Sequence, residues 1–169
     1  MKRIFLALLL AAPVLFSSCS KEETTIGGIA DTKEYGKRLS VSKKDLVTYE
    51  VIRSMSNNKY EHLVFKNNAA GVVITNLMGT TESWAYCPEW GVSNNTLTMV
   101  TEEGASMTFE VSKEYQKTST NSYTIIVYLK GSNGNEFAYE CVDDGGNHAV
   151  AENLWTIINN ERAIKQGKK

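Results

Sequence analysis

The chain has 169 residues, of which 42% are hydrophobic and 22% charged, and its formal net charge is −1. This length suits a single domain with a sizeable core. Between Leu46 and Asn159 there are six basic and 13 acidic side chains. This balance is opposite to that of proteins that bind nucleic acid, so we expect no nucleic-acid partner.

The N-terminus has the pattern of an export signal. A short basic start precedes the apolar run at residues 4–16 (IFLALLLAAPVLF), which is too short to span a bilayer as a helix. Two serines then lead to Cys19. We therefore predict a lipoprotein signal peptide over residues 1–18, which is removed from the mature protein.

The residues around Cys19 resemble the lipobox of bacterial lipoproteins, in which the cysteine becomes the first mature residue and carries lipid on its sulfur and nitrogen. Phe16 stands where leucine is usual. Residues 20–23 (SKEE) are similar to the export signal of Bacteroidota surface lipoproteins. The resemblance implies lipidation of Cys19 and an anchor in the outer membrane, at the cell surface. Several acyl chains on one residue hold a protein stably in a membrane.

A polar segment follows the cysteine. Residues 20–45 are charged and poor in large apolar groups, so most of the segment is not expected to order itself. We predict that residues 19–45 form a flexible tether with a reach of roughly 25–30 Å. Gly36 weakens a short helix that would otherwise start after Asp31.

The chain has three cysteines, an odd number for an exported protein. If Cys19 carries lipid, Cys87 and Cys141 remain, and the prediction is one disulfide that stabilises the fold by roughly 4 kcal/mol. Two separate buried thiols are an alternative. A nucleophilic Cys87 is a third, but it requires a neighbour that stabilises the thiolate, and the local sequence supplies none.

From residue 46 onward, apolar and polar residues alternate with the period of two that is typical of strands. Turn-forming stretches such as NNKY, EEG and GSNGN separate the segments, so neighbouring strands are expected to be antiparallel. Eight strands are predicted, at residues 46–55, 60–66, 72–77, 81–87, 94–101, 105–112, 121–130 and 135–142.

An amphipathic helix is predicted after the last strand, at residues 149–164. Its N-cap is Asp144 or Asn147, and residues 165–169 form a basic tail. The apolar stripe of the helix consists of Val150, Leu154, Ile157 and Ile158.

These elements predict a mainly β domain over residues 46–164, an eight-stranded antiparallel up-and-down barrel with a C-terminal α-helix. The pieces HLVFKNN (62–68), ESWAY (82–86) and NTLTMV (95–100) resemble the lipocalin-like domains of many Bacteroidota lipoproteins. The glycine and tryptophan of that family near the first strand are absent from residues 46–55. A barrel that closes differently and a two-sheet sandwich therefore remain as alternative folds.

The usual parts of a catalytic site are missing from the sequence. The two histidines, His62 and His148, belong to no zinc-binding pair, and no Cys-x-x-Cys, G-x-S-x-G or phosphate-binding loop occurs. A dyad of Cys87 and His148 would need the fold to bring them together. Residues 143–147 (DDGGN) offer oxygens to calcium, but a turn with a helix cap explains them better. We expect no metal and no cofactor.

Acidic residues are numerous enough to supply the carboxylate pair of a glycosidase. Solvated strand faces and turns explain them as well, so we predict that the protein is not an enzyme. The candidates are Glu82, Glu89, Glu136, Glu140, Asp143 and Asp144.

The segment at residues 84–90 (WAYCPEW) supplies candidate ligand-binding aromatics. Trp84 and Tyr86 point to the same face of one strand, and Trp90 follows the proline in a predicted loop. As ligand-binding residues they line the mouth of a barrel that holds a small molecule. As structural residues, Trp84 and Tyr86 fill the core and Trp90 plugs it. We favour the structural interpretation for Trp84 and leave Trp90 open.

Two functions fit these observations. The predicted one is a surface-anchored binding module that captures a small apolar or glycan ligand without chemistry. The alternative is a protein-interaction role, because small barrel inhibitors of cysteine proteases resemble the chain in size and fold and present a glycine-threonine loop. A hairpin turn explains the corresponding residues equally well. These are Met78, Gly79, Thr80 and Thr81.

Overall fold

A computed structural model describes residues 24–26, 29–31, 35–48, 50–119, 122–142 and 149–167. The chain divides into two units, Met1–Thr32 and Lys33–Lys169. In the first unit, β1 (Thr24–Ile26) pairs antiparallel with β2 (Ile29–Asp31). The predicted signal peptide and Cys19 lie outside the described residues.

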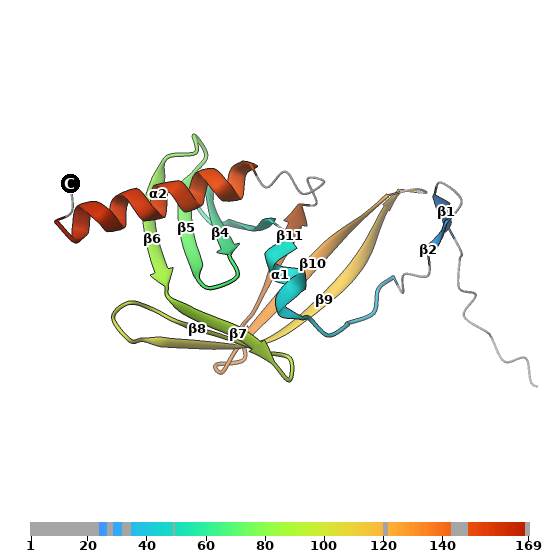
Figure 1. The fold of residues 1–169 in the computed structure, drawn as a ribbon. Helices are drawn as coiled ribbons and strands as arrows, with labels where there is room; N and C mark the ends of the chain where they lie inside the picture. The colour runs from blue at the N-terminus through green and yellow to red at the C-terminus, as the bar shows by residue number, and fades with distance from the viewer. Residues whose placement is uncertain are drawn as a thin grey trace, which may run out of the picture. The chain divides into compact units, whose positions relative to one another are not determined.

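The second unit is built on a nine-stranded antiparallel sheet that curls into a nearly closed barrel (Figure 1). Strands that follow one another in sequence pair with each other, except β6 and β7, and β11 returns to pair with β3. The mainly β fold is confirmed. The strands are β3 (Glu50–Met55), β4 (Lys59–Phe65), β5 (Ala70–Asn76), β6 (Thr81–Cys87), β7 (Glu89–Ser93), β8 (Thr96–Val100), β9 (Ser106–Ser119), β10 (Ser122–Gly131) and β11 (Glu136–Val142).

The predicted count of eight strands is wrong, because β7 occupies a segment that was expected to be a loop. Cys87 pairs with Ala70 on β5, whereas Glu89 pairs with Val100 on β8. Pro88 lies between the two pairings. Because proline lacks the N–H that a ladder requires, β6 ends there and the chain continues as a new strand with a new partner.

The turns between strands follow the predicted turn chemistry. Asn94 and Asn95, expected to begin the strand at 94–101, instead connect β7 to β8 with φ angles of 49° and 57°, the left-handed conformation of a two-residue type I′ hairpin turn. Gly79 and Gly104 hold φ angles of 78° and 81° in the β5–β6 and β8–β9 turns. Glycine adopts this conformation without steric cost.

The end of the predicted tether belongs to the folded unit. Residues 35–39 run beside β9, to which they are joined by two isolated bridges. Helix α1 (Lys43–Thr48) then begins with a capping box: the Asp45 N–H donates to the Ser42 hydroxyl (3.3 Å), and the Ser42 N–H donates to the Asp45 carboxylate (2.8 Å). Leu46, predicted as the start of the first strand, lies in this helix and is 1% exposed.

The main core fills the inside of the barrel. Side chains alternate along each strand, so that Leu63 and Phe65 of β4 face inward while Val64 faces outward. The buried members of the main core are Val41, Leu46, Val51, Leu63, Phe65, Ala70, Cys87, Trp90, Leu97, Met99, Val111, Ile125, Val127, Leu129, Tyr139 and Cys141.

Helix α2 (Ala149–Lys165) confirms the predicted C-terminal helix and contacts β4, β5 and β6 (Figure 1). Leu154 and Ile158 of its predicted apolar stripe form a second core with Val64 and Val73 on the outer face of the sheet. No helix in the described ranges is long and apolar enough to cross a membrane.

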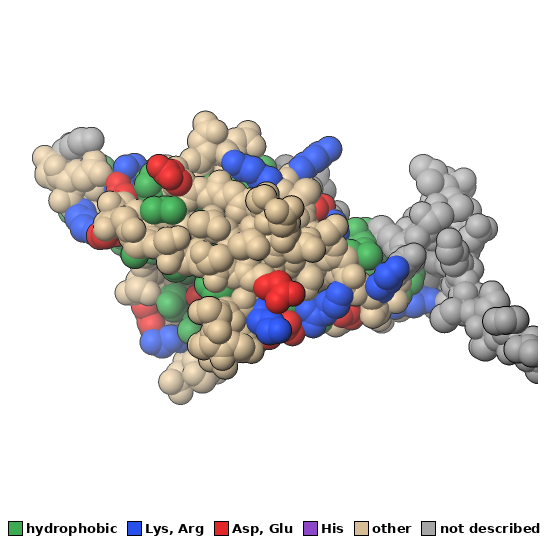
Figure 2. Space-filling view, turned by 90° about the horizontal axis from the view of Figure 1, so that it is seen from below, with side chains coloured by type: hydrophobic (Ala, Val, Ile, Leu, Met, Phe, Trp, Pro, Cys, Tyr) green, Lys and Arg blue, Asp and Glu red, His purple; other side chains and the backbone are tan. Residues whose placement is uncertain are grey.

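Ion pairs tie the end of α2 to the β8–β9 turn. Arg162 pairs with Glu102 at 2.5 Å, and Lys165 pairs with Glu103 at 2.8 Å. The sheet is not closed between its two edge strands, β6 and β7. Because α2 also packs on β6, these ion pairs connect β6, through the helix, to the β8–β9 turn. Figure 2 shows a face of the molecule on which basic and acidic side chains are interspersed.

Candidate functional site

The predicted aromatic residues do not form one site. Trp84 and Tyr86 share a face of β6, as expected, but this face is the outer one that α2 covers. The Tyr86 ring lies 5.8 Å from the ring of Trp155, and the Arg162 guanidinium lies 3.9 Å from the Tyr86 ring centroid. Both residues therefore fasten the helix to the sheet.

Trp90 points the other way, into the barrel. It is 9% exposed, its ring lies 4.6 Å from that of Phe65, and its Nε1–H donates to the carbonyl of Lys66 at 2.7 Å. The Lys43 ammonium lies 4.6 Å from the Trp90 ring centroid. Core side chains occupy the interior that was predicted to hold a ligand, and Trp90 acts as one of them.

The predicted disulfide is not formed. Cys87 and Cys141 are both buried free thiols, and three strands, β5, β4 and β3, separate β6 from β11 in the sheet. The two cysteines are therefore not on neighbouring strands, and neither sulfur bonds to the other. The alternative of two separate buried thiols describes the structure.

Neither thiol is set up as a nucleophile. Burial raises the pKa of Cys141 to about 12. Burial, followed by the charge of Glu103, raises the pKa of Cys87 as well. His148, the suggested partner of Cys87, lies outside the described residues, as do residues 143–147. Within the described ranges, no cluster of three His, Cys, Asp or Glu side chains is arranged to hold a metal ion.

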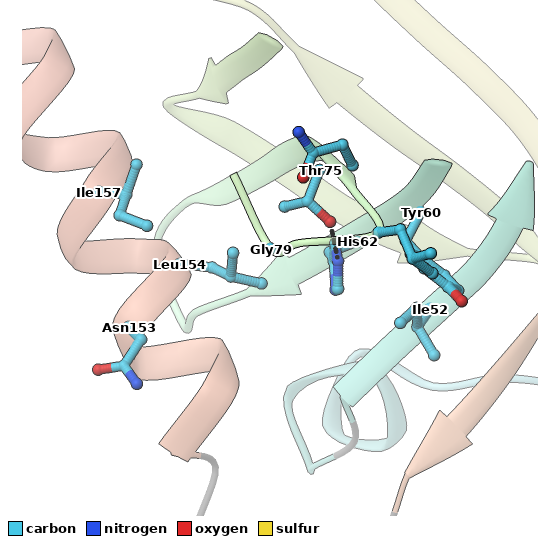
Figure 3. Close-up of a pocket in the computed structure, with 10 residues that line it drawn as sticks. Ile52, Tyr60, His62, Thr75, Gly79, Asn153, Leu154 and Ile157 are labelled. Atoms are coloured by element: carbon cyan, nitrogen blue, oxygen red, sulfur yellow. Dashed lines mark hydrogen bonds between the residues drawn. The ribbon is translucent and has the colours of Figure 1, made fainter. Parts of the chain in front are cut away.

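A groove of about 360 Å³ lies between α2 and the outer face of β3, β4 and β5 (Figure 3). The helix supplies one wall, the strands supply the floor, and the β5–β6 turn closes one side. The groove is lined by Ile52, Tyr60, His62, Thr75, Asn76, Leu77, Gly79, Asn153, Leu154 and Ile157.

The floor of the groove carries a buried polar pair. His62 is 9% exposed and Thr75 is 4% exposed, and the His62 Nε2 lies 3.1 Å from the Thr75 Oγ1 (Figure 3). Burial lowers the pKa of His62 below its ordinary value of 6.5, so the imidazole is neutral at neutral pH. Among the described residues, the second ring nitrogen of His62 has no hydrogen-bond partner.

Strand alternation places these two residues in the groove. His62 lies between the inward-facing Leu63 and the half-buried start of β4, and it shares the outward face with Val64, which α2 covers. Thr75 shares the outward face of β5 with Val73. From the sequence, His62 was noted only as one of two histidines that belong to no zinc-binding pair, and Thr75 was not selected. The available signal for this site was the presence of two polar residues on a strand face that is otherwise apolar and covered by the helix.

The β5–β6 turn borders the groove and exposes apolar side chains. Leu77 is 62% exposed and Met78 is 87% exposed, although turns usually carry polar residues. Leu77 also lines the groove. The residues predicted as an inhibitory loop therefore lie in a tight hairpin turn beside the groove.

The fold and this groove define a barrel-like β domain with a helix-walled apolar groove on its outer face. The chain matches no protein-family model, no curated protein and no solved structure. The kinship with lipocalin-like domains of Bacteroidota lipoproteins therefore stays a prediction from the sequence.

Proposed function

We propose that the protein is a surface lipoprotein, held in the outer membrane by lipid on Cys19, whose lipocalin-like domain is a non-catalytic binding module for a small apolar or glycan ligand. The groove between α2 and the sheet carries this proposal. Its volume of about 360 Å³ lies within the range of ligand sites, which are mostly apolar with a few placed polar groups. The groove takes the role that the sequence assigned to the barrel interior.

The lining supports binding rather than chemistry. Its titratable side chains are the neutral imidazole of His62 and the phenol of Tyr60, and no carboxylate, thiol or lysine belongs to the described lining. A histidine that acts as a base on a hydroxyl is normally oriented by a third group bonded to its other ring nitrogen, and no described residue bonds to His62 there. The groove is built to hold a molecule and release it unchanged.

Filling the groove is expected to abolish ligand binding. Asn153 is exposed on α2 and lines the groove, so Asn153→Trp puts a large side chain across it. Amide NMR shifts of the folded domain, titrated with a panel of small fragments of mixed charge, would report the binding. We expect shifts centred on His62, Thr75 and Leu154 in the unaltered protein and their loss in the variant.

The matched control is Asn159→Trp, which adds the same bulk to an exposed position of α2 that does not line the groove. This variant should bind like the unaltered protein. Fragment shifts that map elsewhere, or that survive Asn153→Trp, would contradict the proposal.

A protease-inhibitor role is the second candidate, and the exposure of Leu77 and Met78 at a protruding turn favours it. If this turn inserts into an enzyme, Gly79→Arg should abolish inhibition of cysteine proteases. Gly104→Arg is the control, because Gly104 holds nearly the same φ in another turn and also has no atom within 4 Å of an added Cβ. Equal inhibition by both variants, or none by the unaltered protein, removes the idea.

A further inference from the structure

The groove has a chemical preference that its lining specifies. Resting on the proposed function, we propose that the ligand is uncharged: an apolar body of about a dozen non-hydrogen atoms carrying one hydroxyl or amide group that bonds to the His62–Thr75 pair. Three independent features support this assignment, namely the charge of the lining, the hydrogen-bonding capacity of the pair and the size of the groove.

The charge of the lining is zero. None of the residues that line the groove is a lysine, an arginine or a carboxylate, and burial keeps His62 neutral. The charged neighbours in sequence are occupied elsewhere, since Lys59 pairs with Glu82, Glu152 pairs with Lys66, and Arg53 pairs with Glu61. A carboxylate or ammonium group in the groove would lose water without gaining a counter-charge, which is strongly unfavourable.

The polar pair offers one donor and one acceptor to a ligand. If His62 Nε2 carries the proton and donates to Thr75, Nδ1 accepts and the threonine hydroxyl is free to donate. If Thr75 donates to Nε2 instead, Nδ1 carries the proton and donates, and the threonine oxygen accepts. Nδ1 points away from Thr75 across the ring, so a single ligand group on the other side bonds to the threonine hydroxyl. This hydroxyl donates in one tautomer and accepts in the other, and a ligand hydroxyl or primary amide suits both cases, whereas a carboxylate can only accept.

The volume and the apolar walls of the groove indicate the size and polarity of the remainder of the ligand. At about 30 Å³ for each water-sized group, a groove of about 360 Å³ has room for about a dozen such groups. Ile52, Leu154 and Ile157 form apolar walls around the polar pair (Figure 3). An apolar body of that size contacts these walls while its single polar group reaches the floor.

Three matched probes test the charge preference on the unaltered protein. 1-Naphthalenemethanol, 1-naphthoate and 1-naphthylmethylammonium share one apolar body and differ in the charge of the polar group. Amide NMR shifts at neutral pH report the binding of each probe. The dissociation constant of the neutral alcohol in the groove should be lower than that of either ion by about tenfold or more. An ion that binds as well as the alcohol, or an alcohol that does not bind there, overturns the inference.

Thr75→Val tests the hydrogen bond, because it removes the hydroxyl and keeps the shape of the side chain. Affinity for 1-naphthalenemethanol should fall roughly fivefold, whereas affinity for 1-methylnaphthalene, which lacks the hydroxyl, should not change. Equal changes for both probes would overturn the role of the pair, and thermal unfolding would show whether the variant is folded.

The proposed function and this inference fail in different ways. If charged fragments occupy the groove and neutral ones do not, the inference is wrong and the binding function stands. If no fragment of any charge occupies the groove, the proposed function fails as well.

Discussion

Replacing Gly71 with alanine is expected to destabilise the domain by about 1–3 kcal/mol, the usual cost of adding a methyl group to a packed core. A Cβ at Gly71 would lie 2.3 Å from the Cδ1 of Ile158. Ile158 is 0% exposed, so its side chain has little room to move away. The denaturant midpoint of unfolding should therefore fall.

Two further variants separate this clash from a general effect of removing glycine. Gly91→Ala is the matched control, because Gly91 also lies in a strand but an added Cβ meets nothing within 4 Å. Ile158→Val removes the Cδ1 that would clash. We expect Gly91→Ala to change stability little, and Gly71→Ala to cost less in the Ile158→Val background. Additive effects of the two substitutions would contradict the predicted contact.

The same contact links stability to the groove. Gly71 lets α2 lie close to β5, and the position of α2 sets the width of the groove, because Leu154 and Ile157 form one of its walls. Gly71→Ala should therefore also alter fragment binding at His62. Sequence patterns cannot predict that the width of the groove depends on Gly71, because this dependence arises only when α2 packs on β5.

Local chemistry made much of the fold predictable. The Gly79 and Gly104 turns were placed because only certain residues adopt positive φ at low cost, although the turn at Asn94 and Asn95 was assigned to the strand at 94–101. Period-two alternation located most strands, and the apolar stripe of α2 located the helix. Each of these signals acts over a few residues and does not depend on distant contacts.

The predictions were wrong where contacts between distant parts of the chain determine the local structure. Pro88 appeared to end a strand and begin a loop, but β8 offers Glu89 a new pairing partner. Residues 35–45 are polar enough for a tether, yet β9 provides bridges and the Ser42–Asp45 box starts α1. The cysteine count suggested a disulfide, but the order of strands in the sheet separates Cys87 from Cys141, and the count carries no information about that order.

The candidate site was missed for the same reason. His62 and Thr75 belong to different strands, and the third side of the groove comes from a helix far along the chain. The sequence showed Trp84 and Tyr86 on one face but not that the face is outside the barrel. Met78 was correctly placed in a turn, whereas Leu77, which is exposed and lines the groove, was assigned to the preceding strand at 72–77.

Replacing Cys19 with alanine is expected to release the protein from the membrane completely. The prediction follows from the lipobox resemblance, because the thiol of Cys19 is the proposed attachment point for lipid. One acyl chain gives only marginal membrane binding, whereas two or more hold a protein stably. Loss of the attachment residue therefore changes the membrane-bound fraction from nearly all of the protein to nearly none.

Expression of the full chain in a Gram-negative bacterium, followed by detergent phase partitioning and mass analysis of the mature N-terminus, measures this change. The unaltered protein should enter the detergent phase with Cys19 as its first, acylated residue. Cys87→Ala is the control, since it removes a buried thiol of the barrel and leaves the signal intact, and it should stay in the detergent phase. If the Cys19→Ala protein remains in the detergent phase, another part of the chain binds the membrane. The proposal of a binding module anchored by lipid on Cys19 would then be contradicted.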